Sequence, residues 1–138
     1  MSRLVTLILV LALAFLSACN LATTPPTAIP TPDLPRVDFE QPANGATVVE
    51  GSELTIDLVA SDETQGIARI ELLVDDLNYR DGTPENEVPV PTFHVLMNWL
   101  AQGVGRHVLT AIAYRPDGTR SDERSILIEV LPRETPTP

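Results

Sequence analysis

From Val37 to Val130 the chain repeatedly alternates core-type and polar residues, and this alternation constrains the fold more than any other feature. A period of two places every second side chain on the same face of a β-strand, whereas no stretch of this region shows the 3.6-residue period of a helix. We therefore expect an all-β fold. The predicted core-facing positions are Val37 and Phe39; Leu54, Ile56, Leu58 and Ala60; Ala68, Ile70, Leu72 and Val74; Phe93, Val95, Met97 and Trp99; His107, Leu109, Ala111 and Ala113; and Ile126, Ile128 and Val130.

Turn-forming residues separate these stretches. Examples are Pro42–Gly45, Asp62–Gly66 and Arg115–Gly118, the last with an early proline and a late glycine that favour a β-turn. About seven short strands at intervals of about 8–12 residues are typical of an Ig-like antiparallel β-sandwich. The predicted domain covers residues 36–132, which is the size of one globular domain.

Several short motifs along this region also resemble a known family. In order they are Pro42-Ala43-Asn44-Gly45, Ala60-Ser61-Asp62, Ile67-Ala68-Arg69-Ile70-Glu71-Leu72, Val74-Asp75, Trp99 and Gly105-Arg106-His107-Val108-Leu109-Thr110-Ala111. Their order and spacing resemble the bacterial Ig-like domains of cell-surface proteins, which implies an Ig-like fold and a surface location. Two features depart from the family pattern: Asp76 stands where a hairpin glycine is usual, and the connection from Leu77 to Pro91 is longer than usual.

The first 18 residues have the organisation of an export signal. Arg3 precedes the apolar run Leu4–Phe15, and small residues follow it. A membrane-spanning helix needs roughly 20 apolar residues, more than this run provides. We therefore expect residues 1–18 to be a cleaved signal peptide.

Leu16, Ser17, Ala18 and Cys19 resemble the lipobox of bacterial lipoproteins. The resemblance implies that Leu16, Ser17 and Ala18 are recognised by the signal peptidase and that Cys19 is lipidated. Cys19 is the only cysteine, so no disulfide within the chain competes for it. The alternative is an ordinary secretory signal cut after Ala18. The predicted location is exported and lipid-anchored to the cell membrane, facing outside or the periplasm.

Proline and threonine dominate residues 19–35 and the tail at 133–138. Proline removes backbone donors and favours polyproline II at about 3.1 Å per residue, so the first segment could act as a tether reaching roughly 50 Å. It would hold the folded domain away from the lipid.

The charge balance excludes one class of partner. The chain has 19 acidic residues against nine basic ones, a formal net charge of −10. Such a chain does not bind nucleic acid through its charge, nor is it attracted to an anionic bilayer. The membrane is therefore expected to be a partner only through the N-terminal lipid.

Between Leu77 and Thr92 the alternation stops, and Asp81-Gly82 and three prolines appear. This predicts a hydrated, mobile loop from Asp76 to Pro91, whose residues Gly82–Val90 could be replaced by a short turn at little cost. Loops on a rigid frame often carry binding residues. The alternative is that Val88 and Val90 pair along a sheet edge. The candidate binding residues are Tyr79, Asp81, Glu85 and Glu87.

The chain offers no convincing catalytic or metal-binding set. Its two imidazoles are His94, on an outward strand face, and His107, at the position where many sandwiches carry a corner tyrosine that bonds back to the chain. Asp62-Glu63 and Asp75-Asp76 with Asp81 are acidic enough for calcium but lack the spacing of a calcium loop. We therefore predict no enzyme activity, no metal and no cofactor.

Aromatic residues separate the remaining hypotheses. Trp99 shares the phase of the core-facing positions of its strand, which favours the core over a sugar-stacking role. Tyr79 and Tyr114 are the tyrosines expected at the surface. The predicted function is non-enzymatic adhesion, display or protein–protein interaction, with an unknown protein or glycan partner. The alternatives are a carbohydrate-binding module, or an accessory subunit of a surface transporter or enzyme complex.

Overall fold

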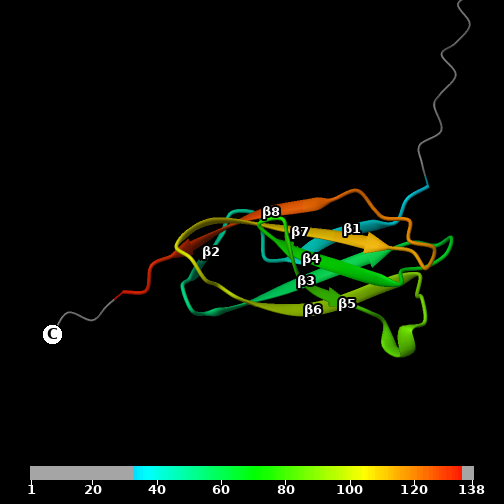
Figure 1. Cartoon of the computed structure of the whole chain (residues 1–138), viewed down its shortest axis with the longest axis horizontal. Coiled ribbons are helices and arrows are strands. Elements are labelled where there is room, and N and C mark those ends of the chain that lie inside the picture. The colour runs from blue at the N-terminus through cyan, green and yellow to red at the C-terminus, as the bar shows by residue number, and fades with distance from the viewer. Residues whose placement is uncertain (1–32, 135–138) are drawn as a thin grey trace, which may run out of the picture. The chain divides into compact units, whose positions relative to one another are not determined.

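A computed structural model describes residues 33–134, in which two β-sheets face each other (Figure 1). The smaller sheet has the strand order β1-β3-β6, and the larger has the order β2-β8-β7-β4-β5. This confirms the predicted Ig-like sandwich, with eight strands instead of about seven. The strands are β1 (Arg36–Gln41), β2 (Ala46–Val49), β3 (Glu53–Ser61), β4 (Arg69–Val74), β5 (Leu77–Gly82), β6 (Thr92–Leu100), β7 (Gly105–Tyr114) and β8 (Arg124–Leu131).

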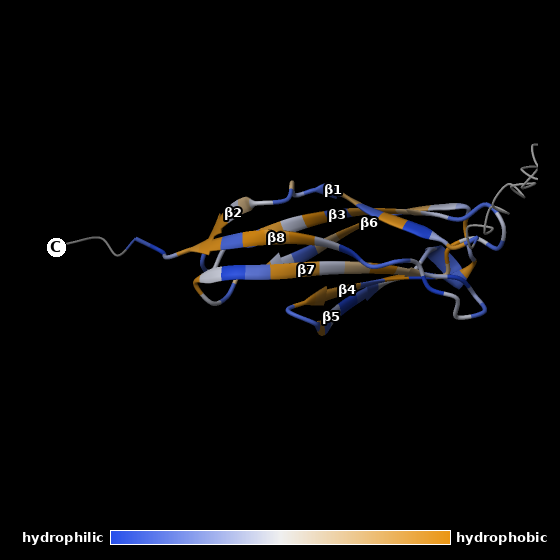
Figure 2. Ribbon diagram, turned by 90° about the horizontal axis from the view of Figure 1, so that it is seen from above, coloured by the Kyte–Doolittle hydropathy of each residue, from blue (hydrophilic) through white to orange (hydrophobic). Residues whose placement is uncertain are grey.

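The core lies between the two sheets and is formed by the faces that the alternation predicts. On β6, for example, Met97 and Trp99 are buried, while Leu96 and Leu100 on either side of them are exposed. Hydrophobic residues recur along β3 and β8, whereas β5 is mostly hydrophilic (Figure 2). Most strands therefore contribute one apolar face, and the buried positions include Ile56, Leu58, Ala60, Ile70, Leu72, Met97, Trp99, Leu109, Ala111, Ala113, Ile126, Ile128 and Val130.

One pairing departs from a purely antiparallel sandwich. The short strand β2 pairs with β8 in parallel, from Ala46 beside Ile128 to Val49 beside Leu131. The chain turns at Pro42–Gly45 and crosses from the sheet of β1 to the sheet of β8, so β2 continues in nearly the direction of β1. Local alternation cannot indicate this direction, because it is the same for parallel and antiparallel neighbours.

The predicted loop from Asp76 to Pro91 is wrong in its first half. Leu77–Gly82 form the edge strand β5, which pairs antiparallel with β4. The end of the segment is also held, because Val90 and Ile67 exchange backbone hydrogen bonds of 2.7 and 3.2 Å. Only the stretch between them, which contains the 3-10 turn η2 (Glu85–Glu87), remains outside the ladders. Val90 thus pairs with Ile67 in an isolated bridge outside the named strands, whereas Val88, which the alternative also placed in an edge pairing, is 59% exposed.

The close packing at Gly82 is a second reason why residues 82–90 cannot be replaced at little cost. A Cβ atom at Gly82 would lie 2.8 Å from Met97 Cε and 3.0 Å from Val95 Cγ2, so the backbone here packs directly on core side chains. Pro84 is also buried. Replacing Gly82–Val90 would therefore remove part of the core's cover, contrary to the low cost that the sequence suggested.

The β4–β5 hairpin turns through two aspartates with left-handed backbone. Val74 pairs with Leu77, and the φ angles of Asp75 and Asp76 between them are +51° and +65°. Two positive φ angles in a two-residue loop are the mark of a type I′ turn, which favours glycine and asparagine. The absent hairpin glycine thus leaves the turn type intact but places a less favourable residue at Asp76.

We expect Asp76→Gly to stabilise the domain. Glycine adopts positive φ without steric cost, so the free energy of unfolding should rise by about 0.5–1 kcal/mol in urea titrations. Asp75→Gly is the matched control, because it relaxes the same turn but removes a carboxylate that binds β7, and it should lower stability. A loss of stability in Asp76→Gly would contradict the strained-turn interpretation.

The described chain enters and leaves the sandwich at opposite ends of its long axis (Figure 1). Asp33 and Leu34 precede β1 at one end, and β8 finishes at Leu131 at the other. No helix within residues 33–134 is long and apolar enough to cross a membrane.

Candidate functional site

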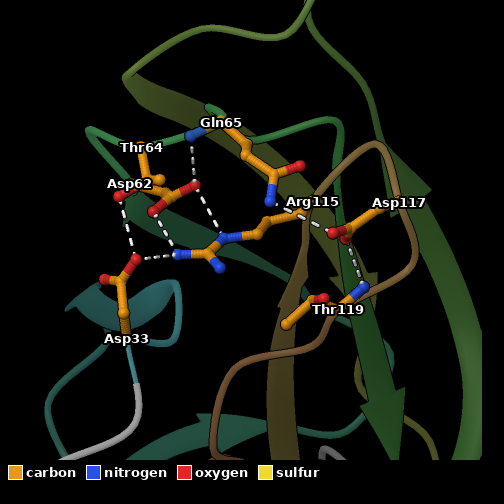
Figure 3. Close-up of polar contacts among 7 residues, drawn as sticks. All are labelled: Asp33, Asp62, Thr64, Gln65, Arg115, Asp117 and Thr119. Atoms are coloured by element: carbon orange, nitrogen blue, oxygen red, sulfur yellow. Dashed lines mark hydrogen bonds and ion pairs between the residues drawn. The ribbon is translucent and has the colours of Figure 1, made fainter.

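The most buried charges of the described chain meet at the end of the sandwich where the chain enters it (Figure 3). Asp62 directly follows β3, and Arg115 directly follows β7. The Arg115 guanidinium donates from Nε to Asp62 Oδ2 at 2.9 Å and from Nη2 to Asp62 Oδ1 at 2.8 Å. Nη2 also donates to Asp33 Oδ2 at 3.0 Å. This paired geometry gives strong, direction-specific hydrogen bonds.

Burial makes this ion pair different from an ordinary surface contact. The side chains of Arg115 and Asp62 are only 6% and 2% exposed, whereas that of Asp33 is 70% exposed. Hydrogen bonding from Arg115 holds the pKa of Asp62 below its usual value, against the opposing effect of burial. Hydrogen bonding to Asp62 in turn raises the pKa of Arg115. Both groups therefore stay charged in the folded protein.

The pair is the centre of a larger network, which we call the Arg115 cluster: Asp33, Asp62, Thr64, Gln65, Arg115, Asp117 and Thr119. Thr64 Oγ1 donates to Asp33 at 2.9 Å, and Gln65 Nε2 donates to Asp117 at 3.1 Å. The backbone N–H groups of Gln65 and Thr119 complete it by donating to the carboxylates of Asp62 and Asp117, at 3.1 and 2.8 Å. The cluster joins three segments that are distant in sequence: the chain before β1, the β3–β4 loop and the β7–β8 turn.

The hydrogen bonds of the Arg115 cluster join charged and polar groups of three separate segments to one another, which is a structural role. The cluster holds the loops at one end and fixes Asp33, the point where the chain joins the sandwich. The sequence patterns do not bring these residues together, because Arg115 stands in a turn motif and Asp62 in an acidic loop. A signal was available: both charges continue the core-facing phase of their strands, Asp62 after Ala60 and Arg115 after Ala113.

His107 has the structural role that its position predicted. Its Nε2 lies 2.7 Å from the carbonyl oxygen of Gly103, and its Nδ1 lies 2.7 Å from Asp75 Oδ2. Asp75 Oδ1 also accepts the backbone N–H of Val108 at 2.9 Å. The ring lies 5.4 Å from the ring of Trp99, at the border of the core. His107 thus ties the β6–β7 loop and the β4–β5 hairpin to its own strand.

These contacts give a prediction about pH. The Gly103 carbonyl and then Asp75 raise the pKa of His107, despite partial burial. A group whose pKa is higher in the folded state stabilises the fold at a pH below its unfolded pKa, and this contribution is lost as the pH rises through the folded pKa. The free energy of unfolding should therefore fall as the pH rises above about 6.5 in the wild type, and fall less in His107→Phe. Equal slopes in urea titrations of the two proteins would contradict this.

The four candidate binding residues do not form one loop. Tyr79 and Asp81 lie on β5, and the Tyr79 hydroxyl donates to the carbonyl of Asn98 on β6 at 3.3 Å. Glu85 and Glu87 lie on η2 and are exposed. The structure thus divides the set between an edge strand and a turn, and a binding role for these residues remains a prediction.

Tyr114 is not the free surface aromatic that we expected. Its hydroxyl donates to Glu71 Oε2 at 2.7 Å, and the Arg69 guanidinium lies 3.6 Å from the centre of its ring. Asn78 donates to the other oxygen of Glu71 at 2.6 Å and to Asp81 at 3.1 Å. This network covers the outer face of β4, β5 and β7, so the ring is half-buried beneath a cation.

Three of the five carboxylates considered for calcium have other partners. Asp62 pairs with Arg115, Asp75 with His107, and Asp81 with Asn78. Within residues 33–134, no group of three or more histidine, cysteine or acidic side chains is placed to hold a metal ion. His94 is exposed, as expected, and lies against Asp57 on the outer face of the smaller sheet. Leu16, Ser17, Ala18 and Cys19 lie outside the described residues.

Comparison with known proteins agrees with this architecture. The model of a family described as "Bacterial Ig domain" matches residues 35–111. The chain is similar to the solved fibronectin(III)-like modules of Clostridium thermocellum CbhA, with 25% identity and a TM-score of 0.61, over 72% of this chain and 100% of that chain. No match is found among curated proteins.

Two further structures are similar in fold alone. The SrpA adhesin of Streptococcus sanguinis has 15% identity and a TM-score of 0.54, over 77% of this chain and 60% of the adhesin. The PKD domain of an M14-like peptidase from Thermoplasmatales archaeon SCGC AB-540-F20 has 13% identity and a TM-score of 0.53, over 72% of this chain and 94% of that chain. This sandwich therefore occurs both in an adhesin and as a domain of an enzyme.

Proposed function

The chain belongs to the bacterial Ig domain family, and on that premise we propose that it is a lipid-anchored, non-enzymatic module that displays a protein-interaction surface outside the cell membrane. The observation that carries the proposal is the position of the two chain ends. The chain enters one end of the sandwich and leaves at the other (Figure 1). This arrangement suits a module that holds a surface at a distance.

The Arg115 cluster supports such a role mechanically. Asp33 lies near the end of the Pro/Thr-rich segment and accepts hydrogen bonds from both Arg115 and Thr64. A tether joined at this point meets an ordered part of the domain rather than a fraying terminus. The domain would then be presented with one end toward the membrane and the other away from it.

The carbohydrate-binding alternative has less support in the described residues. It predicts exposed aromatic rings gathered on one face, as stacking on sugars requires. Trp99 is buried, Tyr114 is covered by Arg69, and Tyr79 is the one exposed aromatic side chain between residues 33 and 134. We therefore favour a protein partner.

Acyl labelling in a bacterial host tests the anchor. We expect the wild-type protein to incorporate a labelled fatty acid and to fractionate with membranes, and Cys19→Ser to lose the label because the acylated sulfur is gone. Asn20→Gln is the matched control and should keep the label. Unchanged labelling of Cys19→Ser would contradict lipidation at this residue.

Protease treatment of intact cells tests display separately. A displayed domain should be cut from the cells within the Pro/Thr-rich segment, which lacks the donors for regular structure, while the sandwich stays intact. Complete protection in intact cells, together with cleavage after the cells are opened, would contradict exposure at the surface.

A further inference from the structure

Four strands form the edges of the two sheets, and three of them carry features that prevent pairing with another chain. β2 is only four residues long. β1 is bulged between Phe39 and Gln41 and is followed by Pro42. The β4–β5 ladder is irregular at Leu72/Leu73, and β5 carries the charges of Arg80 and Asp81.

The fourth edge, β6, lacks these features. It is nine residues long, its register with β3 runs without a shift from Thr92 to Leu100, and it contains neither proline nor a formally charged side chain. It also lies within the uncharged run of residues 88–105. In a chain of net charge −10, this edge is where another acidic surface can approach with the least repulsion.

The backbone groups that face away from β3 can be identified from the ladder. The Ala101 N–H donates to Ser52 and the Pro91 carbonyl accepts from Asp62, so odd-numbered residues point toward β3. The even-numbered residues 92–100 therefore direct their N–H and C=O groups to the free edge. The Tyr79 hydroxyl confirms this direction, since it reaches Asn98 O from β5. A carbonyl oxygen has two lone pairs, so this contact leaves Asn98 able to accept a second bond.

The side chains along this edge are compatible with those of a second β6 strand that runs in the opposite direction. Leu96 lies at the middle of the even-numbered set and is 66% exposed. An antiparallel copy centred on Leu96 would bring Leu96 beside its equivalent, His94 beside Asn98, and Thr92 beside Leu100. No pair in this arrangement opposes two like charges, and the exposed leucines would cover each other.

We propose that β6 is a self-association surface at which two copies of this chain pair antiparallel, with Leu96 on the two-fold axis. The pairing joins two three-stranded sheets into one six-stranded sheet, and the same edge serves both copies, as a two-fold interface requires. One strand pair buries little surface, so the dimer is weak, with a dissociation constant between about 10 µM and about 1 mM. This proposal does not depend on the lipid anchor.

The test uses the mature chain, residues 19–138, with Cys19→Ser to prevent lipidation. Sedimentation equilibrium should show a monomer–dimer equilibrium that Leu96→Lys weakens at least tenfold. Leu127→Lys is the matched control, because Leu127 is also exposed but lies on β8, which is paired on both sides, and it should leave the dimer unchanged. Thermal melts of both variants verify that they fold.

A charge-swap experiment tests the geometry itself. Leu96→Glu alone should weaken the dimer as Leu96→Lys does, whereas an equimolar mixture of Leu96→Lys and Leu96→Glu should associate more strongly than either variant alone, because opposite charges then face each other across the axis. Amide hydrogen exchange should show concentration-dependent protection at His94, Leu96 and Asn98. A chain that stays monomeric at about 1 mM would overturn the proposal. Association that Leu96→Lys does not weaken, or a mixture that fails to associate, would overturn it equally.

Discussion

Replacing Arg115 with methionine is expected to lower the melting temperature by more than about 10 °C. Methionine has nearly the length of the arginine stem but no donors, so the Asp62 carboxylate would remain buried without its charged partner. Breaking a buried pair in this way is far more damaging than losing a surface contact. Thermal unfolding followed by circular dichroism measures the change.

Asp33→Ala is the matched control for Arg115→Met. It removes an acceptor from the same guanidinium, but the Asp33 side chain is 70% exposed and solvent can replace it. Its melting temperature should stay close to that of the wild type. If Arg115→Met also melted near the wild-type temperature, the Arg115 cluster would not be the stabilising centre of this end of the sandwich.

Replacing Trp99 with alanine is expected to reduce the free energy of unfolding by about 3–5 kcal/mol. Trp99 is 4% exposed and belongs to the cluster of side chains that fills the space between the sheets. Its ring also packs against the ring of His107, so the change would disturb the loop that His107 holds. Total stabilities of small domains are only about 5–15 kcal/mol, so this loss brings the variant close to unfolding.

Leu96→Ala provides the comparison on the same strand. Leu96 is mostly exposed, so its truncation in the monomer should change the free energy of unfolding by less than about 0.5 kcal/mol. Urea titrations at low protein concentration compare the two variants without a contribution from association. A Trp99→Ala protein as stable as Leu96→Ala would contradict the core position of Trp99.

The sequence by itself determined the fold class and most of the core. The alternation around Met97 and Trp99 correctly separates the buried face of β6 from the exposed one, because a strand's period of two is a property of the backbone and needs no partner. The turn at Arg115–Gly118 was equally predictable, since the Gly118 N–H bonds to the Arg115 carbonyl through residues adjacent in sequence. The structural role of His107 followed from its position on a recognisable strand.

Only the tertiary structure decided which distant residues meet. Asp62 and Arg115 are 53 positions apart. Their pairing requires that β3 and β7, which belong to different sheets, finish at the same end of the sandwich. β5 could not be recognised from the sequence, because an edge strand with one neighbour and two solvated faces needs no apolar alternation. Its residues Asn78, Arg80 and Asp81 therefore resemble those of a loop. The parallel pairing of β2 with β8 and the free edge of β6 also depend on strand order, and strand order is a property of the assembled sheets that local patterns do not contain.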